Sequence, residues 1–257
     1  MMNKVALITG GATGIGKRTA IELAKQGVHI AVTYRNSSEE ANTLCRLLQK
    51  EFHVRAACYK SDAADAKAST NMVKMVLRDF GTIDILIHNA GPYIHERKKL
   101  MEYSVEEWDY IVNGNLNSFF YLVKEILPEM RKKRWGRIIT FGFEKSDTAP
   151  AWIYRSAFAA AKSGLTSLTK TLALEEAEYG ITVNMICPGD IVGEWKEKDI
   201  QEGKCVPDFT TPVGRPGTGE DIARVISFLC QDHSDFITGS IIPVTGGKNV
   251  LNKVHPE

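Results

Sequence analysis

A glycine-rich turn near the amino terminus has the residue types and spacing needed to bind a phosphate group. It reads Thr9-Gly10-Gly11-Ala12-Thr13-Gly14-Ile15-Gly16 and lies between an apolar run and a segment with helical spacing. Glycines allow backbone angles and a close approach of the chain that a Cβ atom would prevent. Amides at a helix N-terminus face the anion, which the helix dipole stabilises. The turn therefore predicts a site for the pyrophosphate of a dinucleotide, with contacts from Gly10, Thr13, Gly14, Ile15 and Gly16.

Seven short apolar runs and six segments of helical periodicity must position this turn. The runs are nearly continuous in apolar and β-branched residues, which is typical of strands covered on both faces. Strands and helices alternate, so we predict an α/β fold of the Rossmann type: one domain, residues 1–257, with a doubly wound, seven-stranded parallel sheet and helices on both faces. The expected strands are 5–9, 29–34, 54–59, 83–88, 137–141, 182–187 and 240–244. The expected helices are 14–26, 39–51, 66–80, 105–133, 153–179 and 220–229.

One segment, residues 190–212, has weak periodicity and follows a predicted strand directly. It contains Trp195 together with lysines and acidic residues. In open α/β sheets, long excursions after the carboxyl end of a strand often cover the ligand. We therefore expect this segment to form a lid over the substrate, with Trp195 in the substrate pocket.

Composition excludes several classes of function. The formal net charge is +1 and no block of like charges occurs, so we expect no nucleic-acid partner and no membrane surface. The five cysteines form no Cys-x-x-Cys pair and the six histidines show no ligand spacing, so we expect no metal. The N-terminus leads straight into a strand and no apolar run could span a bilayer, which favours a cytoplasmic protein.

The spacing Thr-Gly-x-x-x-Gly-x-Gly resembles the short-chain dehydrogenase/reductase family, and further motifs extend the resemblance over almost the whole chain. The closest branch is that of the 3-oxoacyl carrier-protein reductases. The motifs are Asp62, Asn89-Ala90-Gly91, Asn115, Pro188-Gly189, Arg215-Pro216, Ile237-Thr238-Gly239 and Gly246-Gly247. The resemblance implies an oxidoreductase that binds a nicotinamide dinucleotide. The contacts that it implies beyond the glycine turn are Asp62, Ala63, Asn89, Ala90, Gly91, Lys162, Pro188, Gly189 and Ile191.

The end of the second predicted strand indicates which dinucleotide is bound. An acid at that point bonds the ribose 2′-hydroxyl of NAD and repels the 2′-phosphate of NADP. Tyr34 stands there in this chain, followed by Arg35, Asn36 and Ser37. A guanidinium with hydroxyl and amide donors suits a phosphate, so we predict NADP(H) rather than NAD(H).

Two of the three side chains that carry the chemistry in the family are phenylalanines in this chain. In the family, a tyrosine four residues before a lysine donates a proton to the carbonyl oxygen, and a serine bonds the developing oxyanion. Lys162 is retained. Phe158 occupies the tyrosine position and Phe143 the serine position. A phenyl ring can neither give a proton nor bond an oxyanion.

The first interpretation is that another residue supplies the proton. Tyr154 precedes Phe158 by four residues and Lys162 by eight, so a helix that already runs at residue 154 would align all three on one face. Ser146 could supply the second donor. Asn115 is implied to order a water beside the lysine. Catalysis of carbonyl reduction by Lys162, Asn115 and Tyr154 is the prediction.

Two other interpretations stay open. In one, the protein reduces a conjugated carbon–carbon double bond, and a pocket lined by Phe143 and Phe158 holds a flat, apolar substrate. In the other, the protein binds NADP(H) without turnover, as a sensor or a structural subunit.

The resemblance also implies an assembly, a homotetramer or a homodimer built on the fourth and fifth helices. The tail, residues 248–257, extends beyond the last predicted strand and could reach a neighbouring subunit. The family resemblance implies that the substrate is a small molecule or an acyl thioester.

Overall fold

A computed structural model describes residues 1–249 and 251, and within them the chain forms one seven-stranded sheet in which all strands are parallel. The strand order is β3-β2-β1-β4-β5-β6-β7, so the direction of winding reverses between β1 and β4. All seven strands lie where the sequence predicts them. They are β1 (Val5–Ile8), β2 (His29–Tyr34), β3 (Ala56–Lys60), β4 (Ile85–His88), β5 (Gly136–Phe141), β6 (Ile181–Pro188) and β7 (Ile241–Val244).

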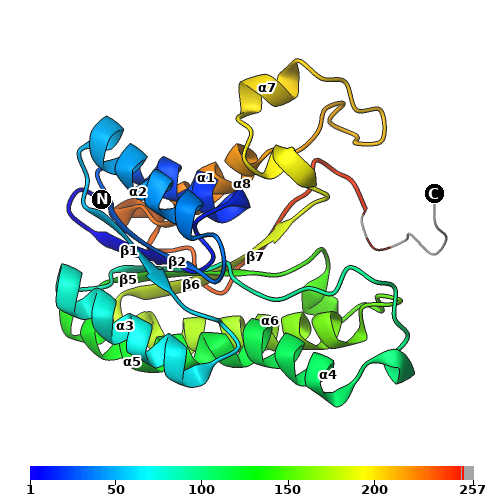
Figure 1. The fold of residues 1–257 in the computed structure, drawn as a ribbon, viewed down its shortest axis with the longest axis horizontal. Coiled ribbons are helices and arrows are strands. Elements are labelled where there is room, and N and C mark those ends of the chain that lie inside the picture. Colours follow the sequence, from blue (N-terminus) through cyan, green and yellow to red (C-terminus); the bar gives the residue numbers. More distant parts are fainter. Residues whose placement is uncertain (250, 252–257) are drawn as a thin grey trace.

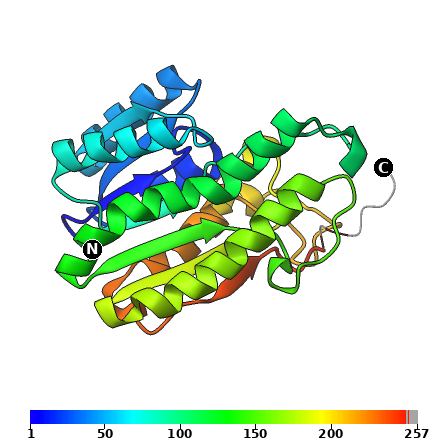
Figure 2. The same ribbon diagram turned by 90° about the horizontal axis from the view of Figure 1, so that it is seen from below.

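Helices cover both faces of the sheet, as predicted (Figure 1). One layer holds α1, α2 and α8, and the other holds α3, α4, α5 and α6. Seen from below, α5 and α6 run side by side across the sheet (Figure 2). The α-helices are α1 (Gly14–Ala24), α2 (Ser38–Phe52), α3 (Ala66–Phe80), α4 (Val105–Val112), α5 (Ser118–Lys133), α6 (Ser156–Glu176), α7 (Ile200–Lys204) and α8 (Gly219–Leu229). The shorter turns are η1 (Leu100–Glu102), η2 (Asn113–Asn117), η3 (Ser146–Thr148), η4 (Ala177–Tyr179), η5 (Gly193–Lys196) and η6 (Asp232–Ser234).

The core consists of two hydrophobic clusters, one on each face of the sheet. Successive strand side chains point to opposite faces, so Ile8 joins the cluster under α1, α2 and α8, while its neighbour Leu7 joins the cluster under α3, α5 and α6. Both side chains are fully buried. This explains why the strands are almost continuously apolar, because neither face meets water.

Two helical predictions need correction in their boundaries. The segment 105–133 contains two α-helices joined by the π-helical turn η2, Asn113–Asn117. The segment 153–179 becomes helical only at Ser156, and Tyr154 has a left-handed backbone with φ 65°. Both differences lie near the carboxyl edge of the sheet.

Residues 190–212 leave β6 and fold over that edge, forming η5 and α7 next to α1 and α8 (Figure 1). The tail predicted to reach a neighbour, residues 248–257, lies largely outside the described residues. No helix among the described residues is both long and apolar enough to cross a membrane.

Candidate functional site

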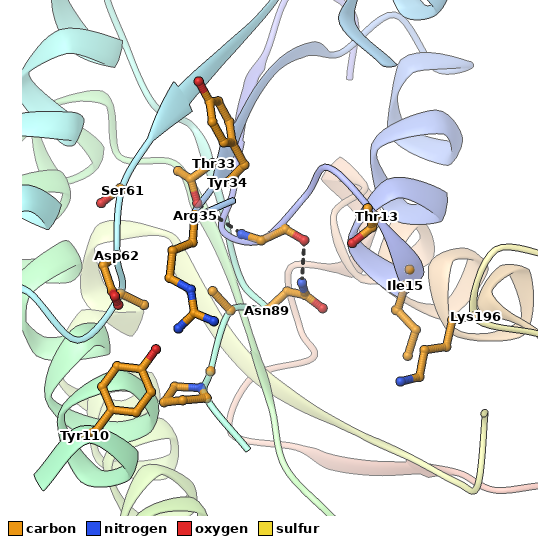
Figure 3. A pocket seen from close by; sticks show the side chains of 16 residues that line it. Thr13, Ile15, Thr33, Tyr34, Arg35, Ser61, Asp62, Asn89, Tyr110 and Lys196 are labelled. Atoms are coloured by element: carbon orange, nitrogen blue, oxygen red, sulfur yellow. Dashed lines mark hydrogen bonds between the residues drawn. The ribbon is translucent and has the colours of Figure 1, made fainter. Parts of the chain in front are cut away.

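A cavity of about 490 Å³ opens at the carboxyl ends of β1, β2 and β4, where the winding reverses (Figure 3). Ligands of open α/β sheets bind at this kind of position. The lining residues that the sequence predicts as cofactor contacts are Gly10, Thr13, Gly14, Ile15, Tyr34, Arg35, Asp62, Ala63, Asn89, Ala90 and Gly91.

The glycine turn is held close to the loop after β4. Asn89 donates from Nδ2 to the carbonyl oxygens of Thr9 and Gly10, at 3.0 and 3.1 Å. Gly10 has φ 60°, and a Cβ on Gly16 would lie 2.6 Å from the Gly10 oxygen. Gly16 therefore serves the packing of the turn and does not itself line the cavity. Gly10, Thr13, Gly14 and Ile15 line the cavity at the N-terminus of α1, the end of a helix that favours an anion such as a diphosphate.

The far end of the cavity is lined by residues at the carboxyl ends of β2 and β3, among them Tyr34, Arg35 and Asp62. Arg35 is exposed, and its guanidinium carbon lies 5.8 Å from the ring centroid of Tyr110. Tyr34 ends β2 where an acid would repel a 2′-phosphate. Asn36 and Ser37, which we expected as contacts, lie beyond the cavity lining, because the chain turns away there into α2. Tyr110, in α4, also lines the cavity but was not predicted from the sequence. The only feature in the sequence that could have indicated it is an aromatic residue in the predicted helix 105–133.

A second cavity of about 540 Å³ adjoins the first and shares Ile15, Asn89, Gly91 and Lys196 with it. It reaches the carboxyl ends of β5 and β6 and the start of α6. Of the predicted residues, Asn115, Phe143, Tyr154, Phe158, Lys162, Pro188, Gly189 and Ile191 line it.

Aromatic rings form one wall of this second cavity. Phe158 lies edge to face with Tyr93, with 5.0 Å between centroids, and Trp152 lies 5.0 Å from Phe143 and 6.0 Å from Phe158. The two phenylalanines at the family's catalytic positions thus belong to one aromatic wall. Tyr93 and Trp152 were missed by sequence reasoning; the signal for Tyr93 is its place two residues after Asn89-Ala90-Gly91.

Lys162 lies at the base of this wall. Its residue is 4% exposed, and its Nζ is 5.6 Å from the ring centroid of Phe158. Burial lowers the pKa of Lys162 to about 8, and Cys187 opposes that shift. Within the described part of the chain, no carboxylate pairs with this ammonium group. Burying the Lys162 ammonium group without a partner lowers the stability of the folded state, which points to a functional role for this lysine.

Burial also affects His88, the last residue of β4. Its Nε2 is 2.8 Å from Ser118 Oγ, and Nδ1 has no partner among the described residues. Burial lowers the pKa of His88 to about 3, and the charge of Lys162 adds to the shift. His88 is therefore neutral at physiological pH.

Asn115 lies in the π-helical turn and is fully buried. Its Nδ2 donates to the carbonyl oxygens of Pro92 and Ile111, at 2.8 and 3.0 Å. Its Oδ1 has no hydrogen-bond partner among the described residues. An acceptor in this position can bind a water beside the cavity, as the resemblance implies.

The two expected replacements for the missing donors are placed differently. Tyr154 lines the cavity from the loop before α6, and the Arg97 guanidinium carbon lies 5.7 Å from its ring centroid. Ser146 is buried away from the cavity and accepts a hydrogen bond from Thr166 Oγ1 at 2.9 Å. Ser146 therefore belongs to the core and cannot supply a second donor from this position.

The segment 190–212 contributes Lys196 to the lining of the cavities, and not Trp195 as expected. Trp195 packs partly buried against the hydrophobic core under α1 and α8 and does not line the second cavity. Its neighbour Lys196 lines both cavities. Because consecutive residues of a short helical turn point in different directions, the core holds the indole and the cavities receive the ammonium.

A family model described as Enoyl-(Acyl carrier protein) reductase matches residues 10–249. The chain is 49% identical to the Bacillus subtilis protein named "Putative oxidoreductase YtkK", covering 96% of this chain and 97% of that protein. It is 34% identical to the 3-oxoacyl-(acyl-carrier-protein) reductase FabG of Staphylococcus aureus, covering 96% and 98%.

Two solved structures share the fold. One, described as a "putative 3-oxoacyl-reductase" from Bacillus thuringiensis, is 49% identical with a TM-score of 0.90, covering 97% of this chain and 99% of that chain. The other is a blue fluorescent protein from a metagenomic library in complex with NADPH. It is 29% identical with a TM-score of 0.83, covering 96% and 98%.

Proposed function

The chain belongs to the short-chain dehydrogenase/reductase family of oxidoreductases, and from this premise we propose that it is an NADPH-dependent reductase of a 3-oxoacyl thioester or a related ketone. When bound, the reduced nicotinamide supplies the hydride. Residues of the chain hold the dinucleotide, exclude water and deliver the proton.

The preference for NADPH is supported by the adenosine end of the first cavity. Arg35 offers a guanidinium there, and Tyr34 stands where an acid would repel a 2′-phosphate. A related protein of known structure, the blue fluorescent protein, is described as a complex with NADPH.

The observation that carries the proposal is that Tyr154 and Lys162 line the same cavity. The Tyr154 hydroxyl donates a proton to the substrate carbonyl oxygen. Lys162 is buried, so its positive charge is weakly screened and stabilises negative charge on the substrate oxygen. A water on Asn115 Oδ1 resupplies the proton.

A second candidate function, reduction of a conjugated carbon–carbon double bond, is favoured by the aromatic wall. Phe143 and Phe158 place no donor at the family's serine and tyrosine positions, and flat apolar substrates pack well on aromatic rings. The matching family model is described as an enoyl reductase.

NADPH oxidation by the purified protein distinguishes these functions. We expect turnover with ketones or 3-oxoacyl thioesters, and Tyr154→Phe should lower kcat by about 10²- to 10⁴-fold because it removes the general acid. Tyr179→Phe, in η4 just after the far end of α6, is the matched control and should keep full activity.

Each contrary result has a definite meaning. Turnover with enoyl thioesters alone, unchanged by Tyr154→Phe, would establish the second candidate. Tight NADPH binding without turnover of any substrate would contradict both and leave a cofactor-binding protein without reductase activity.

A further inference from the structure

The first cavity has an uneven distribution of positive charge. Among its lining residues, Arg35 and Lys196 are the cations, and Arg35 lies at the adenosine end. The glycine turn itself has Thr13 at its exposed position. Lys162 lies in the adjoining cavity, at the base of the aromatic wall. Between these ends, the side chain that brings a positive charge to the turn comes from the segment 190–212.

Lys196 lies directly over the glycine turn. A Cβ placed on Gly14 would have Lys196 Cβ and Cδ as its nearest neighbours, at 3.8 and 3.9 Å. Lys196 also lines both cavities together with Ile15, so it stands where they join. In Figure 3 its side chain extends below Ile15 toward the cavity. This is the N-terminus of α1, where the helix dipole favours an anion and where the Glu197 carboxylate accepts a hydrogen bond from the Gly14 amide.

The ammonium group of Lys196 has no ion pair or hydrogen bond among the described residues, in contrast to the lysines around it. Lys17 Nζ lies 2.6 Å from Glu197, and Lys198 Nζ lies 2.6 Å from Glu202. Both of these lysines are neutralised by a carboxylate. Lys196 therefore keeps its positive charge available to an anion in the cavity.

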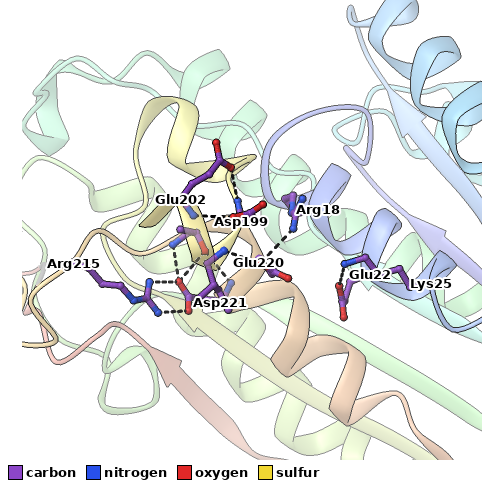
Figure 4. A network of polar contacts seen from close by, with 10 residues as sticks. Arg18, Glu22, Lys25, Asp199, Glu202, Arg215, Glu220 and Asp221 are labelled. Carbon is purple, nitrogen blue, oxygen red and sulfur yellow. Dashed lines mark hydrogen bonds and ion pairs between the residues drawn. The ribbon is translucent and has the colours of Figure 1, made fainter. Parts of the chain in front are cut away.

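The backbone that carries Lys196 is fixed on two helices. The Gly14 amide of α1 donates to Glu197 Oε1 at 2.8 Å. Gly219, at the start of α8, packs so closely on the carbonyl oxygen of Lys196 that a Cβ would collide with it. The amide of Ile200 donates to Glu220 Oε2 at 2.7 Å. Glu220 also pairs with Arg18 of α1 (Figure 4). Because these contacts come from α1 and α8, the backbone at Lys196 is held in place before any ligand binds, which favours binding.

We propose that Lys196 binds the diphosphate of the nicotinamide dinucleotide, supplying from the segment 190–212 the cation that the glycine turn lacks. This inference rests on the proposed function, because it requires that the cavity take a dinucleotide. The diphosphate is common to NADPH and NADH, whereas the 2′-phosphate is particular to NADPH. If Lys196 contacts the diphosphate, it strengthens the binding of both NADPH and NADH. If it contacted the 2′-phosphate, it would strengthen the binding of NADPH alone.

Calorimetric titration of Lys196→Met with NADPH, NADH, ADP and adenosine 2′-monophosphate tests this. We expect the variant to bind NADPH, NADH and ADP about 10- to 100-fold more weakly, the range for a lost hydrogen bond between charged groups, and adenosine 2′-monophosphate unchanged. The slope of log Kd against log salt concentration for NADPH should also decrease. Lys198→Met is the matched control, since that lysine lies in the same segment but is paired with Glu202.

The outcomes separate this inference from the proposed function. Failure of the wild type to bind NADPH would overturn both. Wild-type binding that Lys196→Met leaves intact would overturn the inference alone, and so would a loss confined to NADPH and adenosine 2′-monophosphate.

Discussion

Replacing Lys162 with methionine is expected to stabilise the protein at neutral pH while removing its function. Lys162 is buried without a carboxylate partner among the described residues, so its charged form is less stable in the folded chain than in water. Methionine has nearly the same length and carries no charge. The substitution should therefore keep the packing against Phe158 and remove the unfavourable charge.

The magnitude follows from the pKa of Lys162, which burial lowers from 10.5 to about 8. At 1.36 kcal/mol for each tenfold change in proton affinity, this corresponds to about 3 kcal/mol. The sign depends on pH. Below pH 8 Lys162 is protonated in both the folded and the unfolded chain, so the stability of the folded state is reduced by the full cost of burying the charge. Between pH 8 and 10.5 the folded chain has released a proton that the unfolded chain keeps, so wild-type stability rises.

Urea denaturation of both proteins, without added cofactor, checks this across pH. Lys162→Met should be more stable than wild type by about 3 kcal/mol at pH 7, and the difference should shrink as the pH rises above 8. Lys170→Met, an exposed lysine on the same helix, is the control and should change stability by less than about 0.5 kcal/mol at every pH. A Lys162→Met protein that is less stable at pH 7, or a difference that does not vary with pH, would refute the reasoning.

Three further predictions concern other parts of the site. Burial lowers the pKa of His88 from 6.5 to about 3, so between these pH values the unfolded chain binds a proton that the folded chain does not. The free energy of unfolding should therefore fall by up to about 5 kcal/mol as the pH decreases from 6.5 to about 3. In urea titrations, His88→Asn should reduce this pH dependence. Gly16→Ala should destabilise the protein by about 1–3 kcal/mol and weaken NADPH binding in titrations, because the new Cβ would press on the Gly10 oxygen at 2.6 Å; normal stability and affinity would contradict the packing argument. Arg35→Gln should weaken NADPH binding about 10- to 100-fold and leave NADH binding nearly unchanged, and an equal loss for both would place Arg35 away from the 2′-phosphate.

The sequence alone was sufficient to predict the fold and the position of the first cavity at the glycine turn. Strands buried on both faces must be apolar throughout, so the seven runs could be recognised without tertiary information. The glycine turn could be recognised because its requirements are local. Gly10 and Gly16 must approach neighbouring backbone, and a strand and a helix must flank them.

Side-chain placement at the carboxyl edge of the sheet required the tertiary structure. Helical periodicity continues back through residues 153–155, yet α6 begins at Ser156 and Tyr154 takes a left-handed backbone. Ser146 carries a hydroxyl group in the right loop, but it faces Thr166 and the core. Local patterns do not report which way a loop residue points, because contacts with distant elements decide it.

The segment 190–212 illustrates the same limit with one pair of neighbours. Sequence reasoning placed Trp195 in the pocket because it lies in the long segment that follows the carboxyl end of a strand. In the structure the hydrophobic core under α1 and α8 takes up the indole, and Lys196 turns to the cavities. The residue types that could act were readable in the chain. Which of them reach the cavity was decided by the packing of this segment on α1 and α8, since burying apolar area there stabilises the fold and fixes the direction of every neighbouring side chain.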